Sequence, residues 1–560
     1  MESHDQPSGP SSQTVSISEE AKASQESVKV EPAQDTKPKR DWRFWMVFLC
    51  LTMAQFITAL ELSAVSTALP SIVAALKGDQ FVWVGSAYTL ATTAFVPLSG
   101  GLAETFGRKI TMFGSIVIFA IGSALCGAAT DMNFLIAGRT VQGLGGGGIA
   151  SLCQIILSDM VPLRERGLYT GLIAMTFTIA SGIGPVIGGA LAQSGQWRWL
   201  FYLNIPICGL AAGLVLIFLN LRTPPGTLSE KLAKMDWTGN ALVIAATTSC
   251  MIGLTWGGVQ YQWSSYHILV PLILGLAGLA GFLVYEACIP NNPVVPYHLL
   301  STRTALSGHL QTFLVFTIIQ CLLYYIPVYF QACFSASPVA SGVDVFGMAF
   351  ALSPMTLVTG VTIAISRQYR PQLWLAWAMI LVGTGLLSTM AYDTSRARAI
   401  GFQILTGAFL GSVCGAVFFP ILAPIPIQSN ARAIALYTFF RNFANIIGVT
   451  IGGTILQNEL GTHLPAAFTA RFPEGVASAY SAIPVIPTLE EPLKTQVRQA
   501  FGESLKPVWQ FTIGVSGVGL LVSLLMKHLP LHTEVDKKWG IEDGKEVSVV
   551  PSMEKESSVA

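Results

Sequence analysis

Long apolar runs recur along almost the whole chain, separated by short segments rich in polar residues and glycine. A helix needs about 20 consecutive apolar residues to cross the hydrocarbon core of a bilayer. Runs of about this length lie at 44–66, 81–103, 110–129, 133–157, 168–193, 200–220, 236–258, 266–288, 307–331, 341–366, 373–391, 399–424, 434–457 and 508–528. The pattern predicts an all-α polytopic membrane protein with 14 transmembrane helices.

The composition narrows the class of protein in the same direction. Only 11% of the 560 residues are charged and 52% are hydrophobic, whereas a soluble domain carries about 25% charged residues. Much of the charge lies in two polar tails, 1–43 and 529–560. This balance excludes a cytosolic enzyme, a disordered protein and a nucleic-acid binder, which would need a basic field. The 9 cysteines form no CxxC pair, so no metal site is predicted.

Lysine and arginine in the short loops predict the orientation. Cytoplasmic loops of membrane proteins carry an excess of these residues, and here the excess falls on the loops that share a side with the N-terminus. We therefore expect a multi-pass protein with both termini in the cytoplasm and a long outer loop at 458–507. The N-terminal tail is too polar for the apolar region of a signal peptide. We expect residues 1–43 to form a disordered cytoplasmic tail.

An internal repeat divides the spans. Shifting the chain by 264 residues aligns 139–193 with 403–457, and 11 of the 55 positions are identical, many of them glycine or proline. The repeat predicts a six-span half at 44–220, two linker spans at 236–288 and a second six-span half at 307–528. Two such halves around a midplane cavity are an architecture of transporters.

Two charged residues lie deep in the runs of the first half. Glu61 is about two-thirds of the way along the first span, and Arg139 lies several residues inside the fourth, in RTVQGLGGGG. Charges inside a membrane are costly and usually face a partner or a cavity. Burial disfavours the ionised form of a carboxyl, which suits a group that takes up and releases protons. Both lie in the outer half of the membrane, so we expect them to pair and to couple proton movement. A neutral structural carboxyl and an arginine that extends to the outer interface are the alternatives.

Two further segments and one arginine complete the candidates. GGLAETFGRK (100–109) places Gly101, Glu104, Gly107, Arg108 and Lys109 at the cytoplasmic boundary, where opposite charges can latch one conformation. ASGIGPVIGG (180–189) contains Gly184, Pro185, Gly188 and Gly189, which suggest a hinge or a tight helix contact. Arg441 in the thirteenth span is a candidate cavity charge, with extension to the cytoplasm as the alternative.

Together these segments resemble the major facilitator superfamily, in its 14-span drug:proton antiporter branch. GGLAETFGRK is similar to the loop motif after span 2, with Glu104 where Asp is usual; RTVQGLGGGG and ASGIGPVIGG are similar to the motifs of spans 4 and 5. WRWLFYLNIPI (197–207) resembles the signature after span 5 of the branch, and Glu61 stands where its span 1 motif has Asp. The Ser-rich tail resembles fungal members, many of which export toxins and secondary metabolites.

The resemblance implies proton-driven efflux of amphipathic small molecules at the plasma membrane, with a vacuolar membrane as the alternative. Glu61 would be the proton site, Arg139 its partner, and Pro185 with its glycines a support for alternating access. We expect no cofactor beyond the proton gradient, because no Walker A motif occurs. The expected partners are the substrate, protons and lipid, without nucleic acid, for a monomeric protein.

Three alternatives remain beside this hypothesis. An importer or vacuolar carrier of polar solutes, such as amino acids or siderophores, would use the same fold. A membrane sensor would need a large cytoplasmic domain, for which the tails are too short. A membrane-embedded enzyme would need a cluster of His, Asp or Glu, and the sequence shows none at metal spacing.

Overall fold

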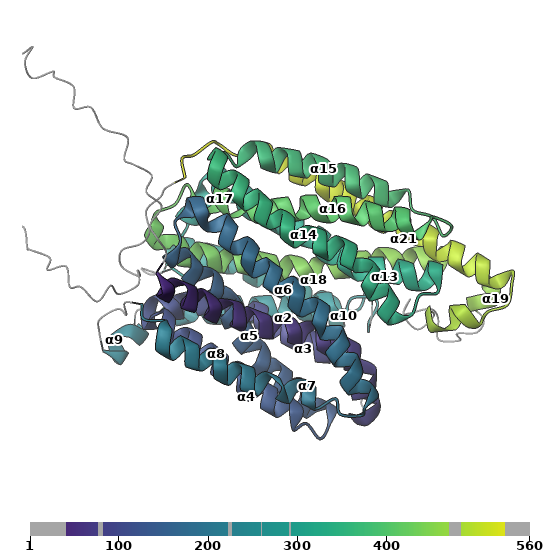
Figure 1. Ribbon diagram of the computed structural model, residues 1–560, viewed down its shortest axis with the longest axis horizontal. Coiled ribbons are helices and arrows are strands. Elements are labelled where there is room, and N and C mark those ends of the chain that lie inside the picture. Colours follow the sequence, from purple (N-terminus) through teal and green to yellow (C-terminus); the bar gives the residue numbers. More distant parts are fainter. Residues whose placement is uncertain are drawn as a thin grey trace, which may run out of the picture. The chain divides into compact units, whose positions relative to one another are not determined.

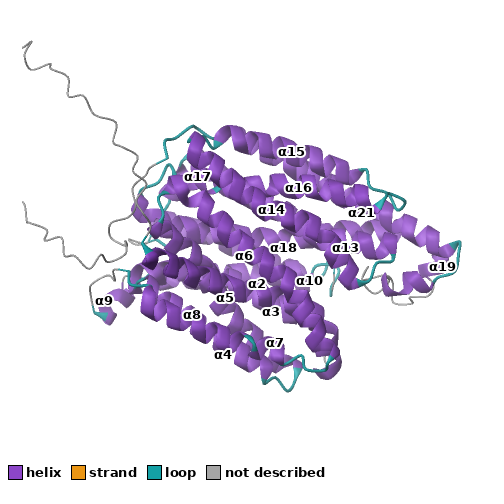
Figure 2. Cartoon of the chain, in the orientation of Figure 1, coloured by secondary structure: helices purple, strands orange, loops and turns teal. Residues whose placement is uncertain are grey.

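The computed structural model describes residues 41–76, 82–221, 227–233, 235–258, 260–289, 293–469 and 483–531. These residues are mostly helical, and no strand is found among them (Figure 2). Thirteen of the described helices are long and apolar enough to cross a membrane. The prediction of an all-α polytopic membrane protein is confirmed. The predicted tails at 1–43 and 529–560 lie almost wholly outside the described residues.

The helices run side by side as a bundle (Figure 1). The N-terminal half comprises α2 (Trp42–Leu76), α3 (Val82–Phe106), α4 (Arg108–Gly127), α5 (Met132–Met160), α6 (Leu163–Gln193), α7 (Trp199–Tyr202) and α8 (Asn204–Phe218). After α9 (Leu228–Ala233) come the linker helices α10 (Trp237–Trp256) and α11 (Tyr266–Cys288), then α12 (His298–Ser301). The C-terminal half comprises α13 (Arg303–Phe334), α14 (Pro338–Ser366), α15 (Arg370–Ser388), α16 (Arg396–Ala416), α17 (Phe418–Leu422), η1 (Ile427–Ser429), α18 (Asn430–His463), α19 (Ala466–Thr469), η2 (Ile483–Thr488) and α21 (Leu493–Leu524).

The second predicted span corresponds to α3, which has 25 residues. It is not among the thirteen helices that meet the criteria of length and apolarity. Its sequence, VWVGSAYTLATTAFVPLSGGLAETF, contains several Thr, Ser and Gly residues, which lower its hydropathy. The count of 14 spans therefore stays a prediction.

Several helices extend beyond their apolar runs. Helix α18 continues to His463, and α21 begins at Leu493, within the segment predicted as the outer loop 458–507. The first turns of α21, LKTQVRQAFGESLK, are amphipathic rather than apolar. An apolar run marks only the part of a helix that lies in lipid, so a helix can begin well before its predicted span.

The glycines of α5 allow its two neighbours to approach closely. A β-carbon at Gly143 or Gly147 would overlap backbone atoms of α3, and one at Gly145 would overlap the backbone nitrogen of Phe119 on α4. Gly148 approaches the hydroxyl of Ser115 on α4 in the same way. The glycine-rich segment therefore packs against two helices at once, which is how small residues act at membrane helix contacts.

The glycines that match in the internal repeat occupy matching contacts. Gly143 approaches the backbone of α3, and its counterpart Gly407 on α16 approaches that of α14. Gly184 on α6 contacts α2, while Gly448 on α18 contacts α13. In the first half, span 4 thus packs against span 2 and span 5 against span 1. In the second half, span 12 packs against span 10 and span 13 against span 9, which is the pairing expected of repeated halves.

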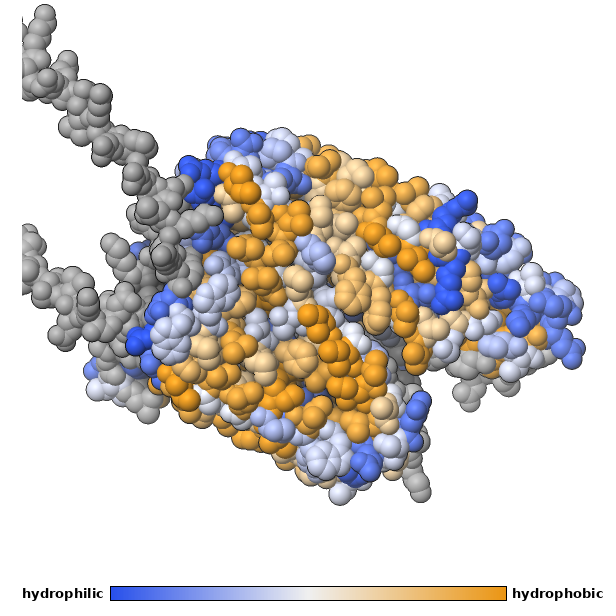
Figure 3. Space-filling view, viewed as in Figure 1, coloured by the Kyte–Doolittle hydropathy of each residue, from blue (hydrophilic) through white to orange (hydrophobic). Residues whose placement is uncertain are grey.

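The linker helices α10 and α11 pack against each other, and α10 also packs against α3 and α18. Gly275 of α11 lies against the backbone of Cys250 of α10, so this pair is closely packed. Apolar residues cover the middle of the face shown in Figure 3, and hydrophilic residues gather toward its ends. This distribution fits a bundle whose middle is surrounded by lipid.

We expect Gly145→Ala to destabilise the protein, because the added methyl group meets the backbone of α4, which cannot move aside as a side chain end could. Overpacking of this kind costs about 1–3 kcal/mol. Thermal melting of the purified protein measures the effect. Gly114→Ala on α4 is the matched control, since a β-carbon there has no neighbour within 4 Å among the described residues. Equal melting temperatures for the two variants would contradict the assigned helix contact.

Candidate functional site

Glu61 and Arg139 form an ion pair inside the N-terminal half. Nη1 of Arg139 on α5 lies 2.5 Å from Oε1 of Glu61 on α2, and each side chain is only 1% exposed. The amide of Asn204, the first residue of α8, donates a hydrogen bond to the second oxygen, Oε2. Three helices therefore contribute to one buried charge cluster.

The guanidinium of Arg139 has further partners on α3 and α5. Its Nε donates to the carbonyl oxygen of Val84 at 2.9 Å, and its Nη1 also donates to Oε1 of Gln142 at 2.6 Å. The ring of Tyr88 lies 4.6 Å from the guanidinium carbon, a cation–π distance. A buried ion pair is stable only when its remaining hydrogen-bonding groups are satisfied, and these contacts meet that condition.

The sequence predicted the pairing of Glu61 with Arg139 but missed Asn204 and Gln142. Asn204 lies within WRWLFYLNIPI, the segment already noted for its resemblance to a family signature. Gln142 lies one helical turn after Arg139, so its position on the same face of α5 was a usable signal. Neither residue is charged, and hydropathy alone does not distinguish it from other polar residues in a span.

A second ion pair joins the two halves at the end of the bundle where α3 ends and α18 begins, here called the Glu104 end. Oε2 of Glu104 accepts a hydrogen bond from Nε of Arg432 at 2.8 Å, and both side chains are partly exposed. A β-carbon at Gly100 would lie 2.8 Å from Cβ of Ala435, so α3 and α18 are in close contact here. Gly101 faces Met235 at an ordinary distance.

The basic residues of the predicted latch have different partners from those expected. Arg108, which is 2% exposed, donates from Nε to Oδ2 of Asp159 at 2.9 Å and from Nη1 to the carbonyl oxygen of Ala103. Lys109 donates to Oδ1 of Asn220 at 2.7 Å. These contacts lie within the N-terminal half. Of the contacts described here for the charged residues of this segment, only that of Glu104 reaches the other half.

Gly107 permits the short connection between α3 and α4. Its φ of 91° lies in the left-handed region, which residues with a β-carbon rarely adopt. The chain therefore turns over one residue, between Phe106 and Arg108, and places Glu104 and Arg108 on either side of the turn.

The halves also meet at the Glu104 end through α6 and α14. A β-carbon at Gly167 would lie 2.6 Å from Cα of Gly360, so the two backbones are almost in contact. Nε of Arg164 donates to the carbonyl oxygen of Ala364 at 2.9 Å. Together with the contact of α3 with α18, this interface closes the two halves against each other at the Glu104 end.

The predicted hinge segment lies within α6, which runs through Pro185 without interruption. A β-carbon at Gly184 would overlap the hydroxyl of Ser63 on α2, so this glycine is needed for the contact of α6 with α2. Gly188 is buried, whereas a β-carbon at Gly189 would meet no described atom within 4 Å. Among the described residues, Gly184 therefore makes a close helix contact that Gly189 does not make.

The last charged candidate, Arg441, and the further charged residue Asp344 both lie at helix contacts. The guanidinium carbon of Arg441 lies 5.5 Å from the ring centre of Phe316 on α13. Asp344 pairs with Arg396 at 2.8 Å, within the C-terminal half. Groups of three or more His, Cys, Asp or Glu side chains placed to hold a metal ion are absent from the described residues.

The sequence matches the family model of the Major Facilitator Superfamily over residues 51–449. The chain belongs to this superfamily. It is therefore a membrane transporter rather than an enzyme, as the motifs in spans 2, 4 and 5 had suggested.

Curated relatives are similar over nearly their whole length. "Efflux pump FUS6" of Gibberella fujikuroi is 36% identical over 521 residues, which cover 91% of this chain and 94% of that protein. "MFS-type efflux pump MMF1" of Pseudozyma antarctica is 37% identical over 502 residues, covering 88% and 92%. "MFS-type efflux pump LUC4" of a Fusarium species is 36% identical over 520 residues, covering 91% and 92%.

Solved structures of the superfamily share the fold. The human organic anion transporter MFSD10 aligns with a TM-score of 0.56 at 11% identity, over 85% of this chain and all of that one. The proton:xylose symporter XylE aligns with a TM-score of 0.55 at 13% identity, over 87% of this chain and 98% of that one. These matches confirm the superfamily fold.

In this superfamily member, we expect Arg139→Gln to lower stability strongly. Removing one partner of a buried ion pair costs about 3–5 kcal/mol, because the other charge is left without compensation. The double variant Glu61→Gln/Arg139→Gln should recover part of the loss, since no charge then remains unpaired. Thermal melting of the two single variants and the double variant measures this coupling. Additive effects of the two substitutions would show that the two side chains do not interact.

Proposed function

We propose that this chain exports amphipathic small molecules in exchange for protons, by alternating access, across the plasma membrane. Both termini would lie in the cytoplasm, so the Glu104 end would be the cytoplasmic end. The observation that carries the proposal is the buried contact of Glu61 with Arg139 and Asn204. A carboxyl so placed is the natural group to exchange a proton inside an apolar bundle.

The proposed coupling follows from the charge balance of this contact. While Glu61 is ionised, it neutralises the guanidinium of Arg139 and holds α2, α5 and α8 together. When Glu61 takes up a proton, the ion pair is lost and Arg139 keeps only its neutral partners. The free-energy difference between these two arrangements is what would drive one conformation into the other.

Export is preferred to import on the evidence of the relatives. Three proteins that match nearly the whole chain are named efflux pumps. A carrier of polar solutes would be expected to present several unpaired charged side chains at the middle of the membrane. The two buried acids described in the N-terminal half are both paired, Glu61 with Arg139 and Asp159, at the end of α5, with Arg108. The alternating-access movement would open the contacts at the Glu104 end and close the opposite end.

We expect Glu61→Gln to reduce proton-driven transport to the level of vesicles without protein. Rhodamine 6G, an amphipathic fluorescent dye, serves as the probe in proteoliposomes whose interior is more acidic than the bath. Exchange of labelled for unlabelled dye without a gradient should persist, because it requires alternating access but no proton step. This second measurement separates loss of coupling from loss of folding.

Glu490→Gln is the matched control for this experiment. Glu490 is an exposed carboxyl between η2 and α21, far along the chain from the ion pair. The control should transport as the unmodified protein does. Full proton-driven transport by Glu61→Gln would exclude Glu61 as the proton site, and absence of dye movement in both assays for the unmodified protein would argue against efflux of this class of molecule.

We further expect the ion pair of Glu104 with Arg432 to favour the state closed at the Glu104 end. A partly exposed pair contributes about 1 kcal/mol, which corresponds to about a fivefold change in population. Spin labels at the exposed residues Ile110 and Leu375 report the distance between the two halves at this end. Glu104→Gln should shift this distance distribution toward longer values, and Glu104→Arg/Arg432→Glu should shift it back.

The control for this measurement is Asp344→Asn, which removes an ion pair of similar length within one half. It should leave the distance between the halves unchanged. If Glu104→Gln behaves in the same way, the contact has no role as a latch.

A further inference from the structure

A cavity of about 270 Å³ lies at the Glu104 end, where the linker helices meet the two halves. Its wall is formed by α3, α10, α11, α12, α13 and α18 and by the segments 235–236 and 293–295. The ion pair of Glu104 with Arg432 is part of this wall, whereas Glu61 and Arg139 are not. The cavity is therefore separate from the proposed proton site.

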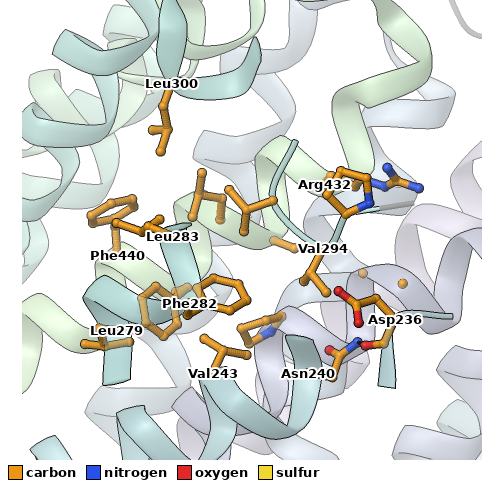
Figure 4. A pocket seen from close by; sticks show the side chains of 18 of the residues that line it. Asp236, Asn240, Val243, Leu279, Phe282, Leu283, Val294, Leu300, Arg432 and Phe440 are labelled. Atoms are coloured by element: carbon orange, nitrogen blue, oxygen red, sulfur yellow. Dashed lines mark hydrogen bonds between the residues drawn. The ribbon is translucent and has the colours of Figure 1, made fainter. Parts of the chain in front are cut away.

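Most of the cavity wall is apolar and much of it is aromatic. Five phenylalanines line it: Phe282, Phe313, Phe439, Phe440 and Phe443. Figure 4 shows Phe282, Leu279 and Phe440 on one side of the cavity and Asp236 with Asn240 on the other. Cavities with an apolar wall and a few convergent polar groups are typical of sites for small molecules.

The polar side of the cavity presents hydrogen-bond acceptors that have no donor. Oδ1 of Asp236 accepts from the backbone N–H of Gly239 at 2.8 Å and from the hydroxyl of Tyr285 at 3.0 Å, but its Oδ2 has no hydrogen-bond partner. Asn240 is 4% exposed, and its Nδ2 donates to the carbonyl oxygen of Asp236 at 2.7 Å. Its Oδ1 also has no partner.

Glu286, close to the end of α11, lies next to Asp236 but is not among the residues that line the cavity. It is 6% exposed, and Oε2 accepts from the N–H of Val295 at 3.2 Å while Oε1 has no partner. A β-carbon at Gly239 would overlap Oδ2 of Asp236 and lie 2.7 Å from Oε1 of Glu286, so both oxygens reach the same point above this glycine. Among the described residues, no cationic side chain is recorded as an ion-pair partner of either carboxyl.

Two acceptors of the wall without a donor, Oδ2 of Asp236 and Oδ1 of Asn240, define what would bind here. A buried acceptor left unsatisfied costs about 1–3 kcal/mol, and a buried charge without a partner costs more. A proton shared by Asp236 and Glu286 would satisfy both carboxyls but would leave Asn240 without a donor. A primary ammonium group supplies three N–H donors and one positive charge. Its apolar body would lie among the phenyl rings.

We propose that this cavity binds an amphipathic primary amine, with its ammonium group on Asp236 and Asn240 and its apolar part against the phenylalanines. This site goes beyond the proposed function, because it lies outside the proton site and its occupation can be measured without transport. The ammonium group could belong to a soluble amine or to the ethanolamine headgroup of a lipid, since both present the same chemistry.

The test compares three ligands with one apolar body on the full-length protein in nanodiscs of phosphatidylcholine. Isothermal titration calorimetry should give at least tenfold tighter binding for 4-phenylbutylamine than for 4-phenylbutan-1-ol, which lacks the charge. The trimethylammonium analogue keeps the charge but has no N–H donor, so it should also bind at least tenfold more weakly. Equal affinities for the three ligands would overturn the proposal.

Two variants locate the site. Asp236→Asn keeps an acceptor for the N–H of Gly239 but removes the charge, and Asn240→Leu removes the amide oxygen; each should weaken binding of the amine at least tenfold. Asp131→Asn makes the same change as the first variant at the residue that caps α5, where Asp131 accepts from the N–H of Phe134, and should leave binding unchanged. Unchanged binding by both cavity variants would exclude this cavity as the site.

A second set of nanodiscs distinguishes the two sources of the ammonium group. Discs that contain phosphatidylethanolamine weaken binding of 4-phenylbutylamine if the lipid headgroup occupies the cavity. An unchanged affinity in these discs assigns the site to soluble amines. Because these measurements need no proton gradient, a failure of the efflux experiment leaves their interpretation intact.

Discussion

The buried ion pair of Arg139 with Glu61 is the interaction on which the arrangement of the N-terminal half depends. A guanidinium deep in an apolar bundle must have its charge neutralised and its N–H donors used. Here α2 supplies the carboxylate, α3 a carbonyl oxygen, and α5 an amide oxygen from Gln142. These helices can approach only because α5 has glycines where it faces α3 and α4. Burial of this charge therefore requires the glycines, because only close packing of the helices brings the partners of Arg139 within reach.

The same reasoning explains why the other buried or half-buried charges lie at contacts between helices. Arg108 joins the start of α4 to the end of α5 through Asp159, and Glu104 joins α3 to α18 through Arg432. The first contact lies within one half and the second lies between halves. Only the second must break if the halves separate at this end, so the two ion pairs differ in role although they are close in sequence. A charge that is buried within one half stabilises the half, whereas a partly exposed charge between halves can be released at small cost.

The sequence predicted those features that follow from one residue or from a regular spacing. Apolar runs located the spans, and the presence of two deep charges, Glu61 and Arg139, was enough to suggest their contact. The partners Asn204 and Arg432 were missed because they are 143 and 328 positions away in the chain from the residues they contact. No periodicity relates such positions, and a polar amide inside a span has no signal of its own. The cavity could not be predicted for the same reason, since its wall comes from six helices that are far apart in the sequence.

The position of the cavity connects it to the movement of the halves. Its wall contains residues of α3 from one half, of α13 and α18 from the other, and of the linker helices between them. Separation of α3 from α18 would therefore change the wall, and a ligand that fits the closed wall would favour the closed state. Coupling of this kind is reciprocal. A ligand that favours the closed state also binds more tightly when another change has already favoured the closed state. The linker helices thus do more than join the two halves, because they complete the wall of a cavity that spans the contact between them.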